Sequence, residues 1–248
     1  MDSVAIIILA AGQGTRMKSN KAKVLHLLSG RPMILYVVDT AVTVCSDNVI
    51  VVVGTQADCV KAVIEKEHQV SYSFQSEQLG TGHAVMCALP EIGDSVTNAV
   101  ILCGDVPLVR PETIVDLISR HENEKNHVTL LAARIPDPTG YGRLVLDQDG
   151  CVERIVEERD ATSHEKGIDV INTGIYCVDR QFLSHALKHV GRDNAQNEIY
   201  LTDIVGIAVS EYKRVGFGLC ADLLELTGIN TADDLLKVEA ALKADETS

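Results

Sequence analysis

The first segment that could do chemistry is a glycine-rich turn near the N-terminus. Residues 9–18 read LAAGQGTRMK and follow an apolar run at 4–9 that predicts a buried strand. The small residues Ala10, Ala11 and Gly12 would leave backbone N–H groups open to a chain of phosphates. Arg16 and Lys23 would supply the opposing positive charge. The segment therefore predicts an anion site, and the alternative is an ordinary tight turn.

The charge of this region differs from that of the whole chain. The 248 residues carry 22 basic and 35 acidic side chains, a net charge of −13. Between Ser3 and Val38 there is no acidic residue, and the basic residues there are Arg16, Lys18, Lys21, Lys23 and Arg31. A positive segment on an acidic body favours one small anionic ligand, with chance clustering as the alternative.

Two common phosphate-binding motifs nearly match this turn, and both fail at Met17. A Walker A loop requires glycine there, and the dinucleotide-binding fingerprint requires its third glycine at the same position. The fingerprint also needs an acidic residue near the end of the second strand, where Gly54 follows Val53. A dinucleotide oxidoreductase is therefore disfavoured.

A carboxylate follows another apolar run, at residues 99–103. Ligands of open α/β sheets bind outside the carboxyl ends of the strands, where Gly104 and Asp105 would lie. An acid that faces an anion site requires a cation between them. Mg²⁺, which binds one or two carboxylates together with phosphate oxygens, fits that role. The alternative is an aspartate that caps the turn before Pro107.

Two further sets offer neutral hydrogen-bonding groups. Gln75 and residues 78–82 (QLGTG) follow a predicted strand, and they suit the edge of a base. Residues 138–142 (PTGYG), Glu157 and residues 172–174 (NTG) suit sugar hydroxyls. Turns, strand ends and the start of a helix are the alternatives.

The elements that would position these residues form an α/β pattern. Apolar runs at 4–9, 49–53, 70–74 and 99–103 predict buried strands, and helices are predicted at 32–44, 56–67, 81–89 and 111–125. Strands that alternate with helices indicate a mainly parallel sheet with helices on both faces.

The second half of the chain differs. It predicts strands at 127–134, 172–178 and 213–220, a hairpin around Asp149-Gly150, helices near 179–190 and 199–211, and a last helix capped by Thr231. We therefore expect one domain over 1–248. It divides into a parallel nucleotide-binding core (1–134), a sugar-binding antiparallel annex that also completes a mixed sheet (135–230), and a C-terminal helix and tail (231–248).

Composition excludes several classes of protein. The acidic total argues against nucleic-acid and membrane-surface binding, and no apolar run is long enough to span a bilayer. An aromatic share of 4% without tryptophan offers no stacking surface for single-stranded nucleic acid. Seven widely spaced cysteines indicate neither a disulfide framework nor a cysteine-rich zinc site, which favours a cytoplasmic protein.

Six motifs occur in a fixed order and together resemble those of a known enzyme family. They read LAAGQGTRM (9–17), KVLH (23–26), QLGTGHA (78–84), GDVPL (104–108), DPTGYGR (137–143) and NTGI (172–175). The combination resembles the N-acetylglucosamine-1-phosphate uridylyltransferase domain of the bacterial bifunctional enzyme that makes UDP-N-acetylglucosamine. This resemblance runs from about residue 4 to about residue 242 and implies a Rossmann-like nucleotidyltransferase fold.

The resemblance implies roles for the residues that match the motifs. Those that would hold the uridine nucleotide are Leu9, Ala10, Ala11, Gly12, Gln75, Gly80, Thr81, Cys103 and Gly104. The implied catalytic residues are Arg16, Lys23 and Asp105, with Asp105 and Asn230 as ligands of a Mg²⁺ cofactor. The implied sugar-side residues are Gly140, Glu157, Asn172, Tyr200, Thr202 and Asn230.

The implied reaction joins UTP to N-acetylglucosamine 1-phosphate, and pyrophosphate leaves. Alternatives are a pyrophosphorylase for another sugar phosphate or nucleotide, and a nucleotide-sugar-binding module without catalysis. The chain departs from the family in two places: Lys21-Ala22 replaces Leu-Pro, which predicts a more mobile loop, and Cys103 replaces an aromatic residue. Nothing repeats every six residues as the family's acetyltransferase β-helix would, so the resemblance leaves the oligomeric state open.

Overall fold

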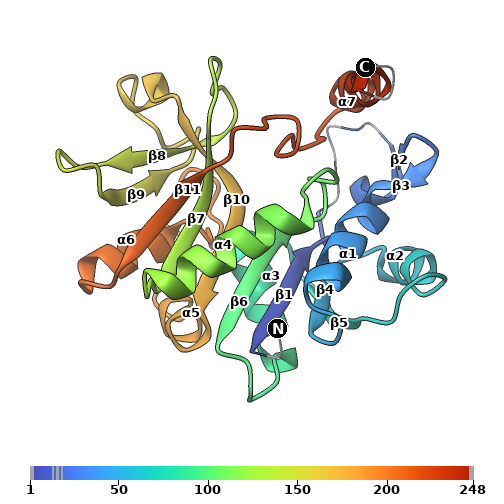
Figure 1. Cartoon of the computed structure of the whole chain (residues 1–248), viewed down its shortest axis with the longest axis horizontal. Coiled ribbons are helices and arrows are strands. Elements are labelled where there is room, and N and C mark those ends of the chain that lie inside the picture. The colour runs from blue at the N-terminus through green and yellow to red at the C-terminus, as the bar shows by residue number, and fades with distance from the viewer. Residues whose placement is uncertain (1–2, 13, 15–16, 18, 246–248) are drawn as a thin grey trace.

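A mixed nine-stranded sheet forms the centre of the molecule (Figure 1). The computed structural model describes residues 3–12, 14, 17 and 19–245. The main path of the sheet has the strand order β11-β7-β10-β6-β1-β4-β5, and β8 pairs with both β10 and β9 beside that path. The expected fold class, a mainly parallel mixed sheet with an antiparallel annex, is confirmed.

The elements follow the predicted order with small shifts at their ends. The strands are β1 (Val4–Leu9), β2 (Leu27–Leu28), β3 (Arg31–Pro32), β4 (Val49–Val53), β5 (Ser71–Phe74), β6 (Asn98–Cys103), β7 (Val128–Arg134), β8 (Gly142–Leu146), β9 (Val152–Val156), β10 (Val170–Asp179) and β11 (Val215–Leu219). The α-helices are α1 (Met33–Val44), α2 (Ala57–Ile64), α3 (Thr81–Ala88), α4 (Pro111–Asn123), α5 (Arg180–Ala186), α6 (Asp203–Ser210) and α7 (Ala232–Asp245). Short 3-10 helices are η2 (Lys23–Leu25), η3 (Leu89–Glu91) and η4 (Glu165–Gly167).

Four neighbouring strands are parallel, with β1 between β4 and β6 and β5 outside β4, and β11 pairs with β7 in parallel at the other end of the sheet. Alternate residues of β1 face opposite sides: Ile6 and Ile8 pack in the cluster that contains α1 and α4, whereas Ile7 packs in the cluster that contains α3, α5 and α6. Both faces are covered along β1 and β4, which explains why these two strands are apolar throughout. The outer strand β5 was predicted to be buried, but only Ser73 of its four residues is, because β5 has a neighbouring strand on one side alone.

The last long strand enters the middle of the sheet. β10 is antiparallel to both β6 and β7, and it separates them. The predicted strand at 127–134 therefore joins the first four strands only through a segment that lies about forty residues later in the chain. Such a non-local pairing leaves no signal in short-range periodicity. The division of the domain at residues 134 and 230 stays a prediction.

A buried charge holds the antiparallel annex together. β8 and β9 form the hairpin expected around Asp149-Gly150, with a loop at residues 147–151. The Arg143 side chain on β8 is 1% exposed and binds the Glu158 carboxylate at 2.7 Å. It also donates to the backbone carbonyl of Tyr141. Glu158 in turn accepts from the N–H of Gly140 at 3.3 Å. One ion pair thus joins the end of β9 to the turn that leads into β8.

The C-terminal helix α7 begins at the predicted cap. The Thr231 hydroxyl accepts from the N–H of Asp234 at 3.1 Å, and the Asp234 carboxylate accepts from the N–H of Thr231 at 2.9 Å. This reciprocal arrangement satisfies backbone donors at the start of the helix. Val238 then packs on Leu28 and Met33, beside the small β2–β3 hairpin. That hairpin was not predicted, because two-residue strands carry no periodicity.

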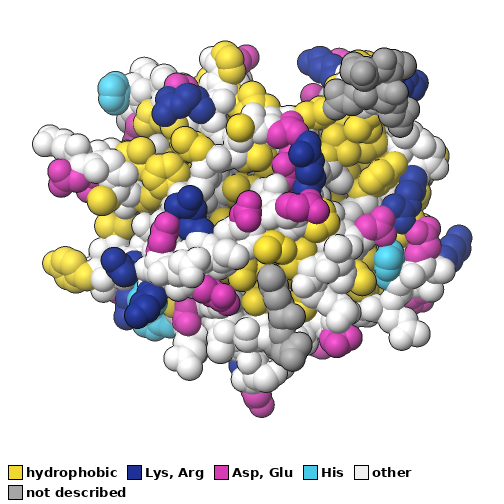
Figure 2. Space-filling model, viewed as in Figure 1, with side chains coloured by type: hydrophobic (Ala, Val, Ile, Leu, Met, Phe, Trp, Pro, Cys, Tyr) yellow, Lys and Arg dark blue, Asp and Glu magenta, His cyan; other side chains and the backbone are white. Residues whose placement is uncertain are grey.

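Charges are dispersed over the face of the molecule that Figure 2 shows. Figure 2 shows acidic and basic side chains interspersed on one face, so the net charge of −13 does not gather in a single patch there. Among the described residues, no helix combines the length and the apolar character that crossing a membrane requires.

We expect the Arg143–Glu158 pair to matter more for stability than an exposed pair in the same annex. Glu158→Gln leaves the buried guanidinium without its counter-charge and should lower the free energy of unfolding by about 2 kcal/mol. The matched control is Asp169→Asn, because Asp169, beside β10 in the annex, and its partner Arg134 are 49% and 60% exposed. That change should cost less than about 1 kcal/mol. Urea unfolding measures both, and equal effects would contradict the prediction.

Candidate active site

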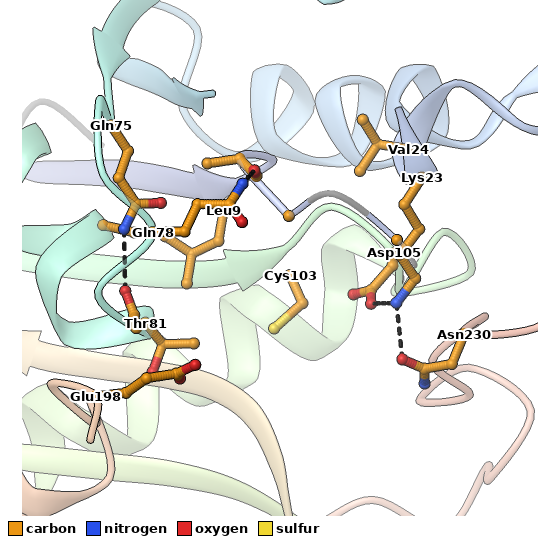
Figure 3. A pocket seen from close by; sticks show the side chains of 15 residues that line it. Leu9, Lys23, Val24, Gln75, Gln78, Thr81, Cys103, Asp105, Glu198 and Asn230 are labelled. Atoms are coloured by element: carbon orange, nitrogen blue, oxygen red, sulfur yellow. Dashed lines mark hydrogen bonds and ion pairs between the residues drawn. The ribbon is translucent and has the colours of Figure 1, made fainter. Parts of the chain in front are cut away.

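A pocket opens at the carboxyl ends of the parallel strands (Figure 3). Leu9 ends β1, Cys103 ends β6, and the two residues are direct partners in the sheet. The cavity measures about 350 Å³. Parallel pairing brings strand ends to one edge, so the pocket lies where ligands of open α/β sheets bind.

Most of the sequence-predicted nucleotide and metal residues line this pocket. They are Leu9, Ala11, Gly12, Lys23, Gln75, Gly80, Thr81, Cys103, Asp105 and Asn230. Ala10 and Gly104 lie behind it: Ala10 is 3% exposed in the core, and a Cβ on Gly104 would meet the Leu9 carbonyl oxygen at 3.0 Å. Arg16 lies outside the described residues, so the structure leaves its predicted role as it stood.

The glycine-rich turn is held against its neighbours by close backbone contacts. The Gln78 side-chain amide donates to the Ala11 carbonyl at 2.6 Å. A Cβ on Gly54 would lie 2.7 Å from the same carbonyl oxygen, so only glycine allows this approach. Gly14 has φ +62° and packs so closely on Lys23 that a Cβ there would meet the Lys23 Cβ at 2.5 Å. The turn and Lys23 are therefore fixed together.

Among the described residues of the positive segment, one cation, Lys23, reaches the pocket. The Lys23 ammonium group donates to the Asp105 carboxylate and to Asn230 Oδ1, the latter at 2.8 Å (Figure 3). Lys21 is exposed. Arg31 instead binds Asp39 and Glu67, which do not line the pocket. The basic residues of the segment therefore form ion pairs at two separate sites or more.

The oxygen atoms of Asp105 and Asn230 fit a divalent cation. A carboxylate and a carboxamide oxygen converge on one positive charge, here the ammonium group of Lys23. Oxygen donors of this kind, completed by phosphate oxygens, are the ligands that Mg²⁺ takes in nucleotide sites. Backbone bonds set the arrangement: the N–H of Ile229 donates to the Asp105 carbonyl at 2.9 Å, and the N–H of Asn230 donates to Asp234 at 3.0 Å.

A second group of possible metal ligands lies elsewhere. Among the described residues, Asp39, Glu67 and His68 have ligand atoms within 4.8 Å of one another. The Arg31 guanidinium binds both carboxylates. Because the guanidinium already occupies both carboxylates, we assign no metal to the group.

The far side of the pocket joins two distant segments. Gln75 is 4% exposed, and its amide nitrogen donates to the Gly80 carbonyl at 3.1 Å. The N–H of Gly82 donates to the Ile199 carbonyl at 2.8 Å, and the N–H of Ile199 donates to the Leu79 carbonyl at 2.6 Å. These bonds place residues 198–201 across the QLGTG segment and bring Glu198 into the pocket wall.

The predicted sugar-side residues other than Asn230 do not line the pocket, but they lie in the adjoining annex. Gly142 pairs with Asn172 across β8 and β10. The Thr202 hydroxyl donates to the Glu157 carboxylate at 3.3 Å. The Cys103 thiol, at the pocket, contacts the Gly174 carbonyl at 3.6 Å, which connects the two regions. The remaining two are Gly140, in the turn before β8, and Tyr200, which is 7% exposed.

Burial controls the protonation of two groups here. Burial, with a smaller effect of the nearby Asp105 charge, raises the pKa of the Cys103 thiol to about 12, so this thiol is neutral and a poor nucleophile. Burial is also the largest influence on Glu157 and raises the pKa of its carboxyl. Asp160, Asp203 and Glu198 act in the same direction, whereas the Thr202 hydroxyl lowers the pKa.

The two departures from the family have structural consequences. The N–H of Ala22, which proline would lack, donates to the Gln56 side-chain oxygen at 2.8 Å, and the Gln56 amide donates to the Asn20 carbonyl at 2.9 Å. These bonds support the loop that the missing proline was expected to loosen. Cys103 is small enough to approach Gly174 closely. A Cβ added at Gly174 would lie 2.8 Å from the Cys103 sulfur.

Comparison with known proteins places this pocket in a family context. The family model for nucleotidyl transferases matches residues 5–220. The chain belongs to the nucleotidyl transferase family. A putative glucose-1-phosphate thymidylyltransferase from Bacillus anthracis, solved in complex with a sucrose, is 20% identical and superposes with a TM-score of 0.73. The match covers 96% of this chain and 94% of that one, which shows that the two nucleotidyl transferases share a fold.

Curated relatives confirm the resemblance drawn from the six motifs. Bifunctional protein GlmU of Halalkalibacterium halodurans is 46% identical over 237 residues, which are 96% of this nucleotidyl transferase and 52% of that protein. Bifunctional protein GlmU of Desulfotalea psychrophila is 42% identical over 240 residues, 97% and 70% of the two chains. The chain thus spans about half the length of the Halalkalibacterium protein.

Three described pocket residues had no predicted role: Val24 and Ala84, which lie within two of the six motifs, and Glu198. Val24 and Ala84 are apolar residues on a 3-10 helix and on α3, and they carry no chemical signal. Glu198 is polar, but it reaches the pocket through backbone pairing with a segment more than one hundred residues earlier. Only long-range information could have found it.

Replacing Glu157 should change the pH dependence of stability, because a buried carboxylate destabilises the native state when it is charged. The raised pKa means that the native state binds this proton more tightly than the unfolded chain does. The stabilisation that the bound proton gives to the native state is therefore complete below the ordinary carboxyl pKa of 4.5, and it is lost as the pH rises through the native pKa. Glu157→Gln should be more stable than the original protein at pH 7.5, and the gain should vanish near pH 4. Urea midpoints at both pH values test this, and a pH-independent difference would contradict it.

Gly80 should tolerate no side chain. It has φ +110°, and a Cβ would lie 2.5 Å from the Ile199 carbonyl oxygen. Gly80→Ala should lower the free energy of unfolding by about 2–3 kcal/mol and weaken nucleotide binding. The control is Gly206→Ala in α6, where a Cβ meets nothing within 4 Å. That change should stabilise the protein by about 0.5–1 kcal/mol. A stable Gly80→Ala protein would refute the close approach.

Proposed function

We propose that this chain is a UDP-N-acetylglucosamine diphosphorylase, which joins UTP to N-acetylglucosamine 1-phosphate and releases pyrophosphate. The observation that carries the proposal is the meeting of Lys23, Asp105 and Asn230 beside the glycine-rich turn, in a nucleotidyl transferase pocket of about 350 Å³. Its similarity to the GlmU relatives, at 42% to 46% identity, supports the choice of substrates.

The reaction needs no nucleophile from the protein. A phosphate oxygen of the sugar phosphate attacks the α-phosphorus of UTP in line, and the bond from that phosphorus to the bridging oxygen of pyrophosphate breaks. The neutral Cys103 thiol and the absence of a histidine from the described pocket lining agree with direct transfer. The barrier then arises from repulsion between anions and from charge that grows on the leaving group, so positioning and positive charge carry the catalysis.

The pocket residues divide this work. The backbone of the turn at Ala11 and Gly12 holds the triphosphate, and Gln75 with the Gly80–Thr81 backbone orients the base. Lys23, together with Arg16, stabilises negative charge on the phosphates. Asp105 and Asn230 would hold Mg²⁺, which when bound neutralises phosphate charge and draws the two substrates together. We place the reaction in the cytoplasm, in line with the seven free cysteines.

The annex supplies the sugar side of the site. In this proposal Gly140, Glu157 and Asn172 receive the N-acetylglucosamine group, with Tyr200 and Thr202 near its phosphate. The Thr202–Glu157 hydrogen bond and the Gly142–Asn172 strand pair support a single cluster. The contact of Cys103 with Gly174 supports its position next to the nucleotide pocket.

The defining experiment is a pyrophosphate-release assay over a panel of nucleotides and sugar phosphates. We expect release with UTP plus N-acetylglucosamine 1-phosphate and a requirement for Mg²⁺. Preference for glucose 1-phosphate or TTP would identify a related pyrophosphorylase instead. Saturable binding of UDP-N-acetylglucosamine without any release would identify a binding module.

Substitutions then test the assigned roles. Asp105→Ala and Arg16→Ala should each lower turnover by about 100-fold or more, because each removes part of the charge stabilisation in the transition state. Circular dichroism serves as the control for folding. Near-full activity in either folded variant would remove that residue from the catalytic set.

A further inference from the structure

We propose that the Lys23 ammonium group is a built-in counter-cation, which occupies the metal position of the nucleotide-free protein and so restricts metal entry to the moment of nucleotide binding. This inference rests on the proposed function, because it takes Asp105 and Asn230 as the metal ligands. It adds an order of events that the reaction alone does not require.

The geometry shows which group holds the position. The Lys23 Nζ atom lies against the Asp105 carboxylate and 2.8 Å from Asn230 Oδ1 (Figure 3). Both oxygen atoms therefore point at one cation. A divalent ion bound to the same two oxygens would lie within a few ångströms of the ammonium group, where like charges repel strongly. Lys23 and a metal cannot share these ligands.

The stem of Lys23 limits where its amine can go. The residue is 9% exposed, and its Cβ packs under Gly14. Its neighbours Ala22 and Val24 are also buried. The amine projects into the pocket. If it moved away from Asp105 and found no other anionic partner, its positive charge would be unpaired in a half-enclosed site. A metal alone offers no such partner.

A polyphosphate changes this balance. In the free protein the positive charge of Lys23 balances the negative charge of Asp105. A divalent ion alone would add two positive charges, whereas an ion that arrives with a nucleotide brings phosphate oxygens for Lys23 to bind. The metal can then take over the oxygens of Asp105 and Asn230, in the mixed carboxylate and phosphate coordination that Mg²⁺ favours. Nucleotide and metal should therefore enter together.

Direct binding of Mn²⁺ in the absence of nucleotide tests the inference. Electron paramagnetic resonance of free Mn²⁺ gives the affinity of each variant without any turnover. The original protein should bind Mn²⁺ weakly, and Lys23→Met, which keeps the aliphatic stem, should bind about tenfold more tightly or better. The added substitution Asp105→Asn should abolish the gain. This loss would locate the new affinity at the proposed ligands.

The matched control is Lys21→Met. It removes the same charge from an exposed side chain two residues away. Exposed charges are screened by salt, so its effect should stay within about twofold. Equal gains for the two variants, or no gain in folded Lys23→Met, would overturn the inference. Lys23→Gln provides a second neutral variant if Lys23→Met does not fold.

Two results separate this inference from the proposed function. Tight Mn²⁺ binding by the original protein without nucleotide would overturn the inference whatever the variants do, and it would leave the diphosphorylase activity intact. Failure to release pyrophosphate would remove the activity, but it would not change the competition between Lys23 and Mn²⁺.

Discussion

Parallel pairing of β1 with both β4 and β6 is the constraint on which the rest of the molecule depends. It forces the strand ends at Leu9, Val53 and Cys103 to one edge of the sheet. Each end must then turn sharply into a following segment, and small residues allow the backbones to meet there, as Gly54 does against Ala11. Because the helices cover both faces, this edge is where a polar ligand can reach the sheet.

Local patterns predicted most of this arrangement. The strand at 4–9 and the strand at 49–53 have the predicted bounds, because each is apolar throughout and ends at small or glycine residues. The last helix begins where Thr231 predicted, because a cap is a local interaction. The glycine-rich turn and Asp105 lie together because strand direction alone determines where strand ends meet.

What sequence could not predict is non-local. The insertion of β10 between β6 and β7, and the crossing of residues 198–201 over the QLGTG segment, join parts of the chain that share no short-range pattern. The partner of each charge was also unpredictable. Within one positive segment, Lys23 binds Asp105 whereas Arg31 binds Asp39 and Glu67, and only the three-dimensional structure separates these cases.

The Ala22–Gln56 hydrogen bond has an evolutionary consequence. The two residues are 34 positions apart, yet the carboxamide of one satisfies the backbone of the other and also holds Asn20. A lineage that places proline at position 22 loses the donor and gains stiffness from the ring, so glutamine at position 56 keeps only its bond to residue 20. A lineage that keeps alanine depends on that glutamine. Positions 22 and 56 should therefore covary among homologues, so that the support of the nucleotide loop is inherited as a pair of residues.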